Sequence, residues 1–201
     1  MARSFKTGPA PSRHHHAMSD TSKRYARLAD AFTATVAAVP DDRWTSPSPC
    51  EGWTARDVVR HVVESHGLFL GLVGRGLGQI PSVDGDPLGA WAAARATVQA
   101  DLDDPARASA AFDGYFGRTT FEQAIDRFIC TDLVVHRWDL ARAAGLDDGI
   151  DPEELERVQA QAEQFGDALR RPEAFGPPLE PPPGADRQTQ VLAFLGRRCW
   201  D

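Results

Sequence analysis

The sequence has no run of 18 or more apolar residues, and its first residues do not follow the charged-then-apolar pattern of a secretory signal. We therefore expect a cytoplasmic protein with no membrane partner. Basic residues are also in deficit, because 22 Lys and Arg stand against 29 Asp and Glu, which gives a net charge of −7. Three of the basic side chains lie in residues 1–17, so the rest of the chain is more acidic still. This balance argues against a nucleic-acid partner.

Cysteine is scarce too, with single residues at Cys50, Cys130 and Cys199. They form no C-x-x-C pair and their number is odd, so a disulfide framework is not expected. Cys130 falls within a predicted helix and is interpreted as a small core residue. Cys50 falls within a predicted loop, where a reactive thiol is the minor alternative.

Length and composition favour one globular domain after a short leader. The chain has 201 residues, of which 42% are hydrophobic and 25% charged, and this is ordinary for a single domain with a substantial core. Residues 1–17 are predicted to be a disordered leader or tag-like extension, because they hold a Gly-Pro-Ala-Pro-Ser stretch and the run His14-His15-His16. An exposed, flexible His cluster binds metal without being a functional site, so it is excluded. The domain is placed at residues 18–201.

Apolar residues recur at spacings of three and four along most of the remaining chain, which is the pattern of amphipathic helices. Stretches rich in Gly and Pro separate these segments and are predicted to be loops. No strand-like alternation competes with this pattern. We predict an all-α protein, a four-helix bundle with additional short helices. The expected helices span residues 22–39, 54–73, 88–102, 119–143, 151–169 and 189–196, and the expected loops span 41–53, 74–87, 103–117 and 171–184.

Local signals mark several helix ends. Thr54 and Asp57 form a capping-box-like start, in which the Thr54 hydroxyl is placed for the Asp57 amide. Asp151 followed by Pro152 is a strong helix start, and Gly145 is expected to end the helix at residues 119–143.

Two polar side chains, Asp132 and His136, stand out in the helix predicted at residues 119–143. A spacing of four residues places them one turn apart on the same helix face. At about 100° per residue both fall near the middle of an apolar arc, so both are expected to point at the core. Burying them is costly unless a hydrogen bond, a counter-charge or a metal ion compensates. A divalent ion bonds both groups at about 2.0–2.2 Å, so the pair is interpreted either as part of a metal site or as a satisfied Asp–His pair.

A metal on Asp132 and His136 needs at least a third protein ligand. Outside the leader, the other histidines are His61 and His66, both in the helix predicted at residues 54–73. This favours a three-ligand site that bridges two helices. Such a site keeps a coordination position open, as catalytic zinc sites do. Periodicity alone does not choose between His61 and His66.

Two stretches of the chain are distinctive. The first is Pro49-Cys50-Glu51-Gly52-Trp53-Thr54, which leads to His61, and the second is Asp132-Leu133-Val134-Val135-His136, which leads to Arg142. Together they resemble the actinobacterial branch of the DinB-like superfamily, and specifically the metal-binding domain of the mycothiol-dependent maleylpyruvate isomerases. The resemblance extends from Tyr25 to Trp200.

The resemblance implies a four-helix bundle that holds one divalent metal, with zinc the expected ion and nickel, iron or manganese the alternatives. The ligands that it implies are His61, Asp132 and His136. On this basis His66 is interpreted as a core or rim residue.

The chain departs from the isomerase pattern at two points. Asp132 stands where the isomerase has Glu, so the carboxylate is one methylene shorter. The isomerase also has a further C-terminal domain that supplies a catalytic arginine, and a chain of this length is expected to lack it. The resemblance therefore implies a metal-dependent thiol transferase or related enzyme, in which the metal activates water or a low-molecular-weight thiol such as mycothiol toward a small electrophilic substrate.

Two other interpretations of these residues stay open at this point. One is a non-catalytic metal-binding bundle that acts as a sensor, carrier or interaction domain, which a pocket closed to thiols would favour. The other is a metal-free hydrogen-bond network among His61, Asp132 and His136. The oligomeric state is open as well, and a homodimer is one alternative.

Neighbouring residues have more than one interpretation. Asp139 either orients a ligand imidazole or pairs with a neighbouring Arg. Arg137 and Arg142 are interpreted as solvated helix charges rather than guides for an anionic substrate. Trp53 and Trp138 are interpreted as packing groups, with a pocket wall as the alternative.

Overall fold

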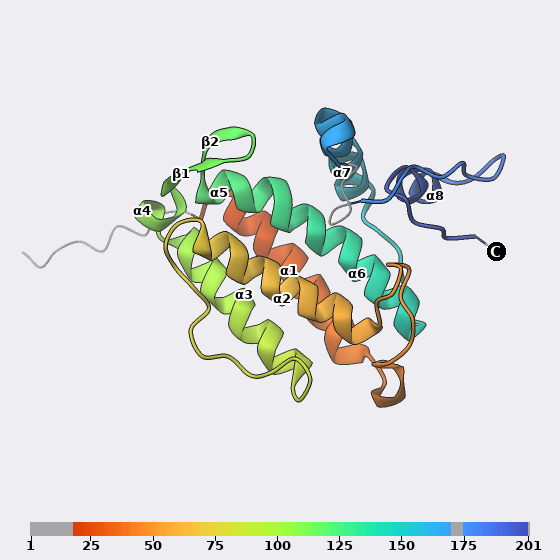
Figure 1. The fold of residues 1–201 in the computed structure, drawn as a ribbon, viewed down its shortest axis with the longest axis horizontal. Helices are drawn as coiled ribbons and strands as arrows, with labels where there is room; N and C mark the ends of the chain where they lie inside the picture. The colour runs from red at the N-terminus through yellow and green to blue at the C-terminus, as the bar shows by residue number, and fades with distance from the viewer. Residues whose placement is uncertain (1–17, 170–174, 201) are drawn as a thin grey trace, which may run out of the picture.

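Four long helices form a bundle in the computed structural model, which describes residues 18–169 and 175–200. Helix α1 (Asp20–Ala38) and helix α2 (Ala55–Gly71) each pack against both α3 (Pro87–Asp103) and α6 (Cys130–Ala144). Figure 1 shows α2 and α6 side by side and running in opposite directions. The predicted all-α four-helix bundle is confirmed, whereas the leader predicted at residues 1–17 lies outside the described residues.

The bundle core is made by the apolar faces that the sequence spacing predicts. Tyr25 and Phe32 of α1 are fully buried, as are Trp91 of α3 and Leu70 of α2. The rings of Phe32 and Trp91 meet edge to face with centroids 4.9 Å apart, a favourable arrangement for two aromatic side chains. Helix α2 begins at the predicted capping box, because Thr54 and Asp57 satisfy each other's backbone amides.

The helix predicted at residues 119–143 is present without a break from Phe121 to Ala144, but it is not uniformly α-helical. It consists of α5 (Phe121–Ala124), a π-helical turn η2 (Ile125–Ile129) and α6, and Gly145 ends it in the left-handed conformation with φ 71°. A π turn holds more residues than an α turn, so it shifts the rotational phase of the residues before α6. Sequence periodicity across this region is therefore misleading.

A short β-hairpin occupies part of the segment that the sequence predicts to be an irregular loop. After α4 (Pro105–Ala108), strands β1 (Ala111–Gly114) and β2 (Gly117–Thr120) pair antiparallel. Gly117 has φ 98° at the turn, which only glycine adopts easily. The sequence predicts irregular structure at residues 103–117, and the hairpin differs from that expectation because strands of four residues give only a weak alternation signal.

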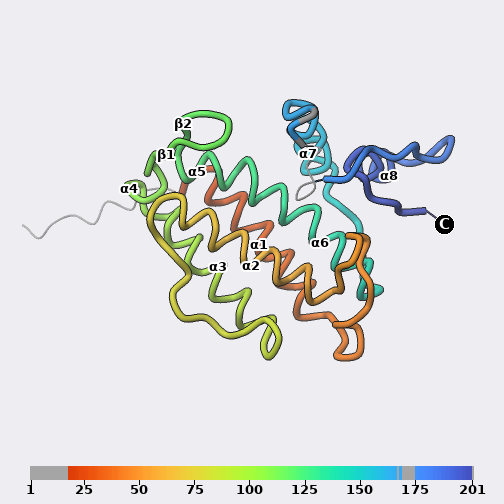
Figure 2. Tube along the Cα trace, viewed as in Figure 1, coloured from red at the N-terminus to blue at the C-terminus, as the bar shows by residue number. Residues whose placement is uncertain are grey.

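The remaining elements lie outside the four long helices, and two of them lie near one end of α6 (Figure 1). They are η1 (Asp41–Arg43), α7 (Pro152–Phe165), η3 (Gly166–Leu169) and α8 (Arg187–Phe194). Figure 2 shows α7 and α8 near this end of α6, opposite the hairpin. Among the residues that the structure describes, no helix combines the length and the apolar character needed to cross a bilayer.

Candidate metal centre

The three predicted ligands meet between α2 and α6. Candidate ligand atoms of His61, Asp132 and His136 all lie within 4.8 Å of one another. His61 Nε2 is 3.7 Å from Asp132 Oδ2, and the centroids of the two imidazole rings are 4.7 Å apart. The structure therefore brings these side chains together from two helices, while metal binding by them stays a prediction.

Exposure differs among the three side chains. His136 is buried, but the side chains of His61 and Asp132 are 31% and 26% exposed. The expectation that both Asp132 and His136 point at the core is thus right for His136 and wrong for Asp132. The π turn that precedes α6 explains the error, because the apolar arc was counted through it at a constant angle. Burial opposes ionisation of Asp132, but the two nearby imidazoles outweigh it and lower the pKa of this carboxyl.

Asp139 holds His136 in one orientation. His136 Nδ1 donates to Asp139 Oδ2 at 3.0 Å, and Arg197 donates to the same carboxylate through Nη2 at 3.2 Å. Burial opposes ionisation of Asp139, but the charge of Arg197 and the hydrogen bond from His136 outweigh it and lower the pKa to about 2. Because ionised Asp139 accepts the Nδ1 proton, Nε2 of His136 keeps its lone pair for a ligand. Both interpretations of Asp139 apply, although its arginine partner comes from the far end of the chain.

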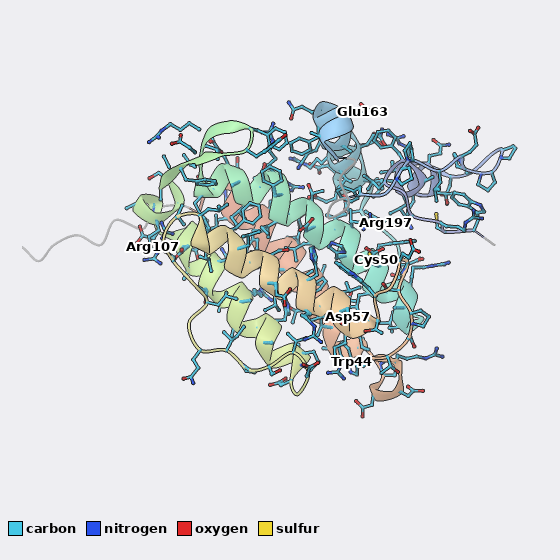
Figure 3. The ribbon with its side chains drawn as sticks, in the orientation of Figure 1. Trp44, Cys50, Asp57, Arg107, Glu163 and Arg197 are labelled. Atoms are coloured by element: carbon cyan, nitrogen blue, oxygen red, sulfur yellow. The ribbon has the colours of Figure 1, made fainter. Side chains whose placement is uncertain are left out.

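Cys50 lies against the same carboxylate. Its Sγ is 3.3 Å from Asp139 Oδ2 and 3.6 Å from Arg197 Nη2. Figure 3 shows Cys50 and Arg197 close together at this end of α6. Burial and the negative charge of Asp139 raise the pKa of Cys50 to about 12, so at neutral pH its thiol is protonated and donates to Asp139. The structure therefore favours a hydrogen-bonding role for Cys50 over a reactive thiol.

The loop before α2 carries Cys50 and Trp53 to the site. Ser48 N donates to Trp53 O at 2.8 Å, Trp53 N donates to Cys50 O at 3.0 Å, and Gly52 adopts φ 76° between them. The Trp53 ring lies 4.9 Å from the ring of His61 and 6.0 Å from that of His136. Trp53 is therefore a wall of the site, as one of its two interpretations predicts.

A pocket of about 1020 Å³ opens onto the three side chains. Its polar end includes His61, Asp132 and His136, and its other lining residues include several phenylalanines. This volume is at the upper end of typical small-molecule sites, which hold about 300–1,000 Å³.

His66 does not contribute to the site. It is 1% exposed, and both ring nitrogens have partners, because Nδ1 is 2.7 Å from Val62 O and Nε2 is 2.9 Å from the Tyr25 hydroxyl. Burial lowers its pKa to about 4, so it is neutral at pH 7. The interpretation of His66 as a core residue is confirmed.

Arg197 is the main site residue that sequence reasoning missed. It is 6% exposed, it pairs with Asp139, and its guanidinium lies 4.9 Å from the Phe175 ring. The available signal was weak, since Arg197 only ends the segment Leu192-Ala193-Phe194-Leu195-Gly196-Arg197. No spacing rule connects an arginine to an aspartate 58 residues earlier.

The other candidates near the motif lie outside the pocket. Arg137 donates to the backbone carbonyls of Asp147 and Gly149, and Arg142 pairs with Asp148 at 3.4 Å. The side chain of Trp138, a residue of α6, is fully buried, so it is a packing group. The two arginines, interpreted as solvated helix charges, lie outside the pocket lining, but both contact protein groups rather than solvent alone.

Comparisons with known proteins address the identity of the chain. The family model described as the mycothiol maleylpyruvate isomerase N-terminal domain matches residues 25–141, which contain His61, Asp132, His136 and Asp139. Two uncharacterized proteins of Mycobacterium tuberculosis, one from strain H37Rv and one from strain CDC 1551, are each 34% identical over 187 residues, which cover 89% of this chain and 98% of theirs. No solved structure matches. The chain therefore belongs to the family of the mycothiol maleylpyruvate isomerase N-terminal domain.

Proposed function

We propose that this protein binds one divalent metal ion, with zinc as the expected ion, through His61, Asp132 and His136. We further propose that the site serves a thiol-dependent transferase that uses a cofactor such as mycothiol. The observation that carries the proposal is the convergence of three ligand-type atoms within 4.8 Å at one end of an open pocket. Family membership supports the thiol, because the matching model is named for mycothiol.

The three side chains fit an ion in both spacing and chemistry. Two atoms bonded to one tetrahedral zinc ion at about 2.1 Å lie about 3.4 Å apart. The 3.7 Å between His61 Nε2 and Asp132 Oδ2 is close to this separation, and all three ligand atoms lie within 4.8 Å of one another, so binding an ion requires small side-chain rotations. Two imidazoles and a carboxylate form a donor set that suits zinc, nickel, iron and manganese.

The same distance counts against a metal-free network. A direct hydrogen bond between imidazole nitrogen and carboxylate oxygen needs about 2.7–3.2 Å, so 3.7 Å is too long. Asp139 already takes the Nδ1 proton of His136. A shared ion explains better than mutual hydrogen bonds why these three groups face one another.

The chain's own residues prepare the site for a thiol. Asp139 fixes the ring of His136, Arg197 neutralises Asp139, and Trp53 covers both imidazoles on one side. A bound divalent ion would supply a Lewis acid that lowers the pKa of a thiol. The remaining pocket volume leaves room for the rest of the thiol and for an acceptor.

The alternative is a metal-binding bundle without turnover, which would act as a sensor, carrier or interaction domain. A closed metal site would favour it, because structural zinc sites use four protein ligands. The open pocket and the partly exposed Asp132 favour the enzyme instead.

Metal content tests the first half of the proposal. The full chain with His14, His15 and His16 replaced by Ala should retain about one metal ion per chain by elemental analysis. The added substitution His136→Ala should remove it, and Arg137→Ala, a partly exposed neighbour on the same helix and outside the pocket lining, should not. Metal-free protein in the first case would overturn the proposed centre.

Turnover tests the second half. Metal-loaded protein should accelerate conjugation of mycothiol to monochlorobimane, and the His136→Ala variant should not. Stoichiometric metal with no conjugation of any thiol would instead support the non-catalytic bundle.

A further inference from the structure

We propose that the acceptor in this pocket is an uncharged aromatic electrophile, held by a phenylalanine cluster beyond the metal ligands. The cluster consists of Phe69, Phe116, Phe128 and Phe165, all of which line the pocket. The chemistry of this acceptor rests on the proposed function, whereas the binding preference rests on the pocket alone.

The four rings come from separate parts of the chain and form one contiguous cluster, in which some neighbouring pairs are stacked and others are tilted. The centroids of Phe116 and Phe165 are 4.8 Å apart, those of Phe128 and Phe165 are 5.4 Å apart, and those of Phe69 and Phe128 are 5.6 Å apart. None of them is fully buried, and Phe116 is 48% exposed. Clustered rings that stay partly exposed inside a pocket offer a further aromatic ring favourable contacts.

The cluster lies along the same groove as the metal ligands. Phe69 follows His61 by eight residues on α2, and Phe128 precedes His136 by eight residues. Because α2 and α6 run in opposite directions (Figure 1), both steps lead the same way, by about 12 Å at 1.5 Å per residue. This span accommodates a sulfur atom at the ligands and a two-ring aromatic body toward the cluster.

The charges of the lining argue against an anionic acceptor. The pocket's lining arginines are Arg127 and Arg197 in the described part of the chain, and its lining carboxylates are Glu51, Asp113 and Asp132. Asp139 neutralises Arg197. Arg127 lies 5.0 Å from the ring of Phe165 and donates to Gln164. Once the proposed divalent ion is counted beside Asp132, these charges roughly balance, so the lining offers a small dicarboxylate no surplus of positive charge, whereas an uncharged ring needs none.

The transfer itself needs no redox partner. The thiol gives its proton to water, its sulfur forms a bond to the electrophilic carbon, and a halide leaves that carbon with the bonding electron pair. An activated aryl halide such as 1-chloro-2,4-dinitrobenzene satisfies this balance.

Equilibrium binding tests the pocket without turnover. N-phenyl-1-naphthylamine, an uncharged aromatic fluorophore, is titrated into the full chain before and after dialysis against a chelator. Phe165→Ala and Phe116→Ala should each raise its Kd about tenfold, the expected cost of a lost ring contact. Leu68→Ala is the matched control, because Leu68 is 63% exposed on α2 and outside the pocket lining. A Kd unchanged in both phenylalanine variants would overturn the proposal.

Competition separates the two acceptor classes. Uncharged 1-naphthol should displace the fluorophore, and maleate should not. If maleate displaces the fluorophore at a lower concentration than 1-naphthol does, the proposal is overturned in favour of an anionic acceptor. If a phenylalanine variant fails to fold, this competition on the unmodified chain decides by itself.

Kinetics then distinguishes the failure of each proposal. With mycothiol as donor, Phe165→Ala should raise the KM for 1-chloro-2,4-dinitrobenzene about tenfold and leave the KM for mycothiol unchanged. Tight aromatic binding without conjugation would refute the proposed function and leave the binding preference standing. If conjugation occurs but the phenylalanine variants change neither the Kd of the fluorophore nor the KM for 1-chloro-2,4-dinitrobenzene, the acceptor class is refuted and the proposed function stands.

Discussion

His61 and His66 lie on the same helix, five residues apart, and the structure gives them opposite surroundings. His66 points into the bundle core, where both of its nitrogens have hydrogen-bond partners. His61 lies on the side of α2 that faces α6, where its side chain is 31% exposed beside Asp132. The same residue type therefore serves as a core residue in one place and as a candidate ligand in the other.

The contrast shows what separates a core histidine from a candidate ligand. In the core histidine both ring nitrogens have hydrogen-bond partners, whereas the candidate ligand keeps a nitrogen lone pair that no short hydrogen bond to a described residue uses. His66 has no free ring nitrogen and a pKa of about 4, so it is neutral and occupied. Among the described residues, the polar neighbours of His61 Nε2 are the hydroxyl of Ser65, at 3.4 Å, and the carboxylate of Asp132, at 3.7 Å. Neither contact is a short hydrogen bond, which leaves this nitrogen suited to a metal.

The largest expected effect is the loss of metal affinity when His61, but not His66, is replaced. In the full chain without the leader histidines, His61→Ala should weaken metal binding by about 100-fold or more, because it removes one of three ligands. His66→Gln should leave metal affinity within about twofold, since it changes no ligand. Isothermal titration with zinc measures both, and the reverse result would show that the ligands were assigned to the wrong histidine.

A smaller effect is expected at the residue that orients His136. Asp139→Asn should weaken metal binding about 10- to 100-fold, because the amide holds the imidazole less strongly and leaves Arg197 unpaired. Asp148→Asn is the matched control, since Asp148 pairs with Arg142 away from the candidate ligands. Equal affinities in the two variants would contradict an orienting role for Asp139.

Core burial of His66 predicts a pH effect on stability. The unfolded chain takes up a proton near pH 6.5, whereas burial keeps His66 neutral in the folded chain down to about pH 4. Between these values the unfolded state binds more protons, so stability falls as pH falls, by about 2 kcal/mol from pH 7 to pH 5. Urea unfolding at pH 7 and pH 5 measures this loss of unfolding free energy. In the His66→Gln variant the loss should be smaller by about 2 kcal/mol. Equal losses would mean that His66 does not titrate as its burial indicates.

The smallest effect is expected at the start of the shared helix. Thr54→Ala removes the hydroxyl that accepts from the Asp57 amide, so it should lower the free energy of unfolding by about 1 kcal/mol. Metal affinity should change by less than about twofold, because neither histidine moves. Thermal unfolding against Thr45→Ala, an exposed loop residue, provides the comparison. Equal melting temperatures would show that the capping box contributes nothing.

Much of the bundle could be predicted because its signals are local. The start of α2 follows from Thr54 and Asp57, and the start of α7 follows from Asp151 and Pro152. The hairpin was missed because strands of four residues give only a weak alternation signal, and the π turn was missed because the sequence analysis assumed a constant helical angle. The exposure of Asp132 was mispredicted for the second of these reasons.

The sequence by itself determined the four long helices, the i, i+4 spacing of Asp132 and His136, and the resemblance that singled out His61. These follow from local hydrogen bonding and from residue types at fixed spacings. Only the tertiary structure decided that Arg197 neutralises Asp139, that Cys50 shares this carboxylate, and that four phenylalanines from separate parts of the chain form one wall. Contacts between residues far apart in the chain depend on how whole helices pack, and no short sequence pattern encodes that arrangement.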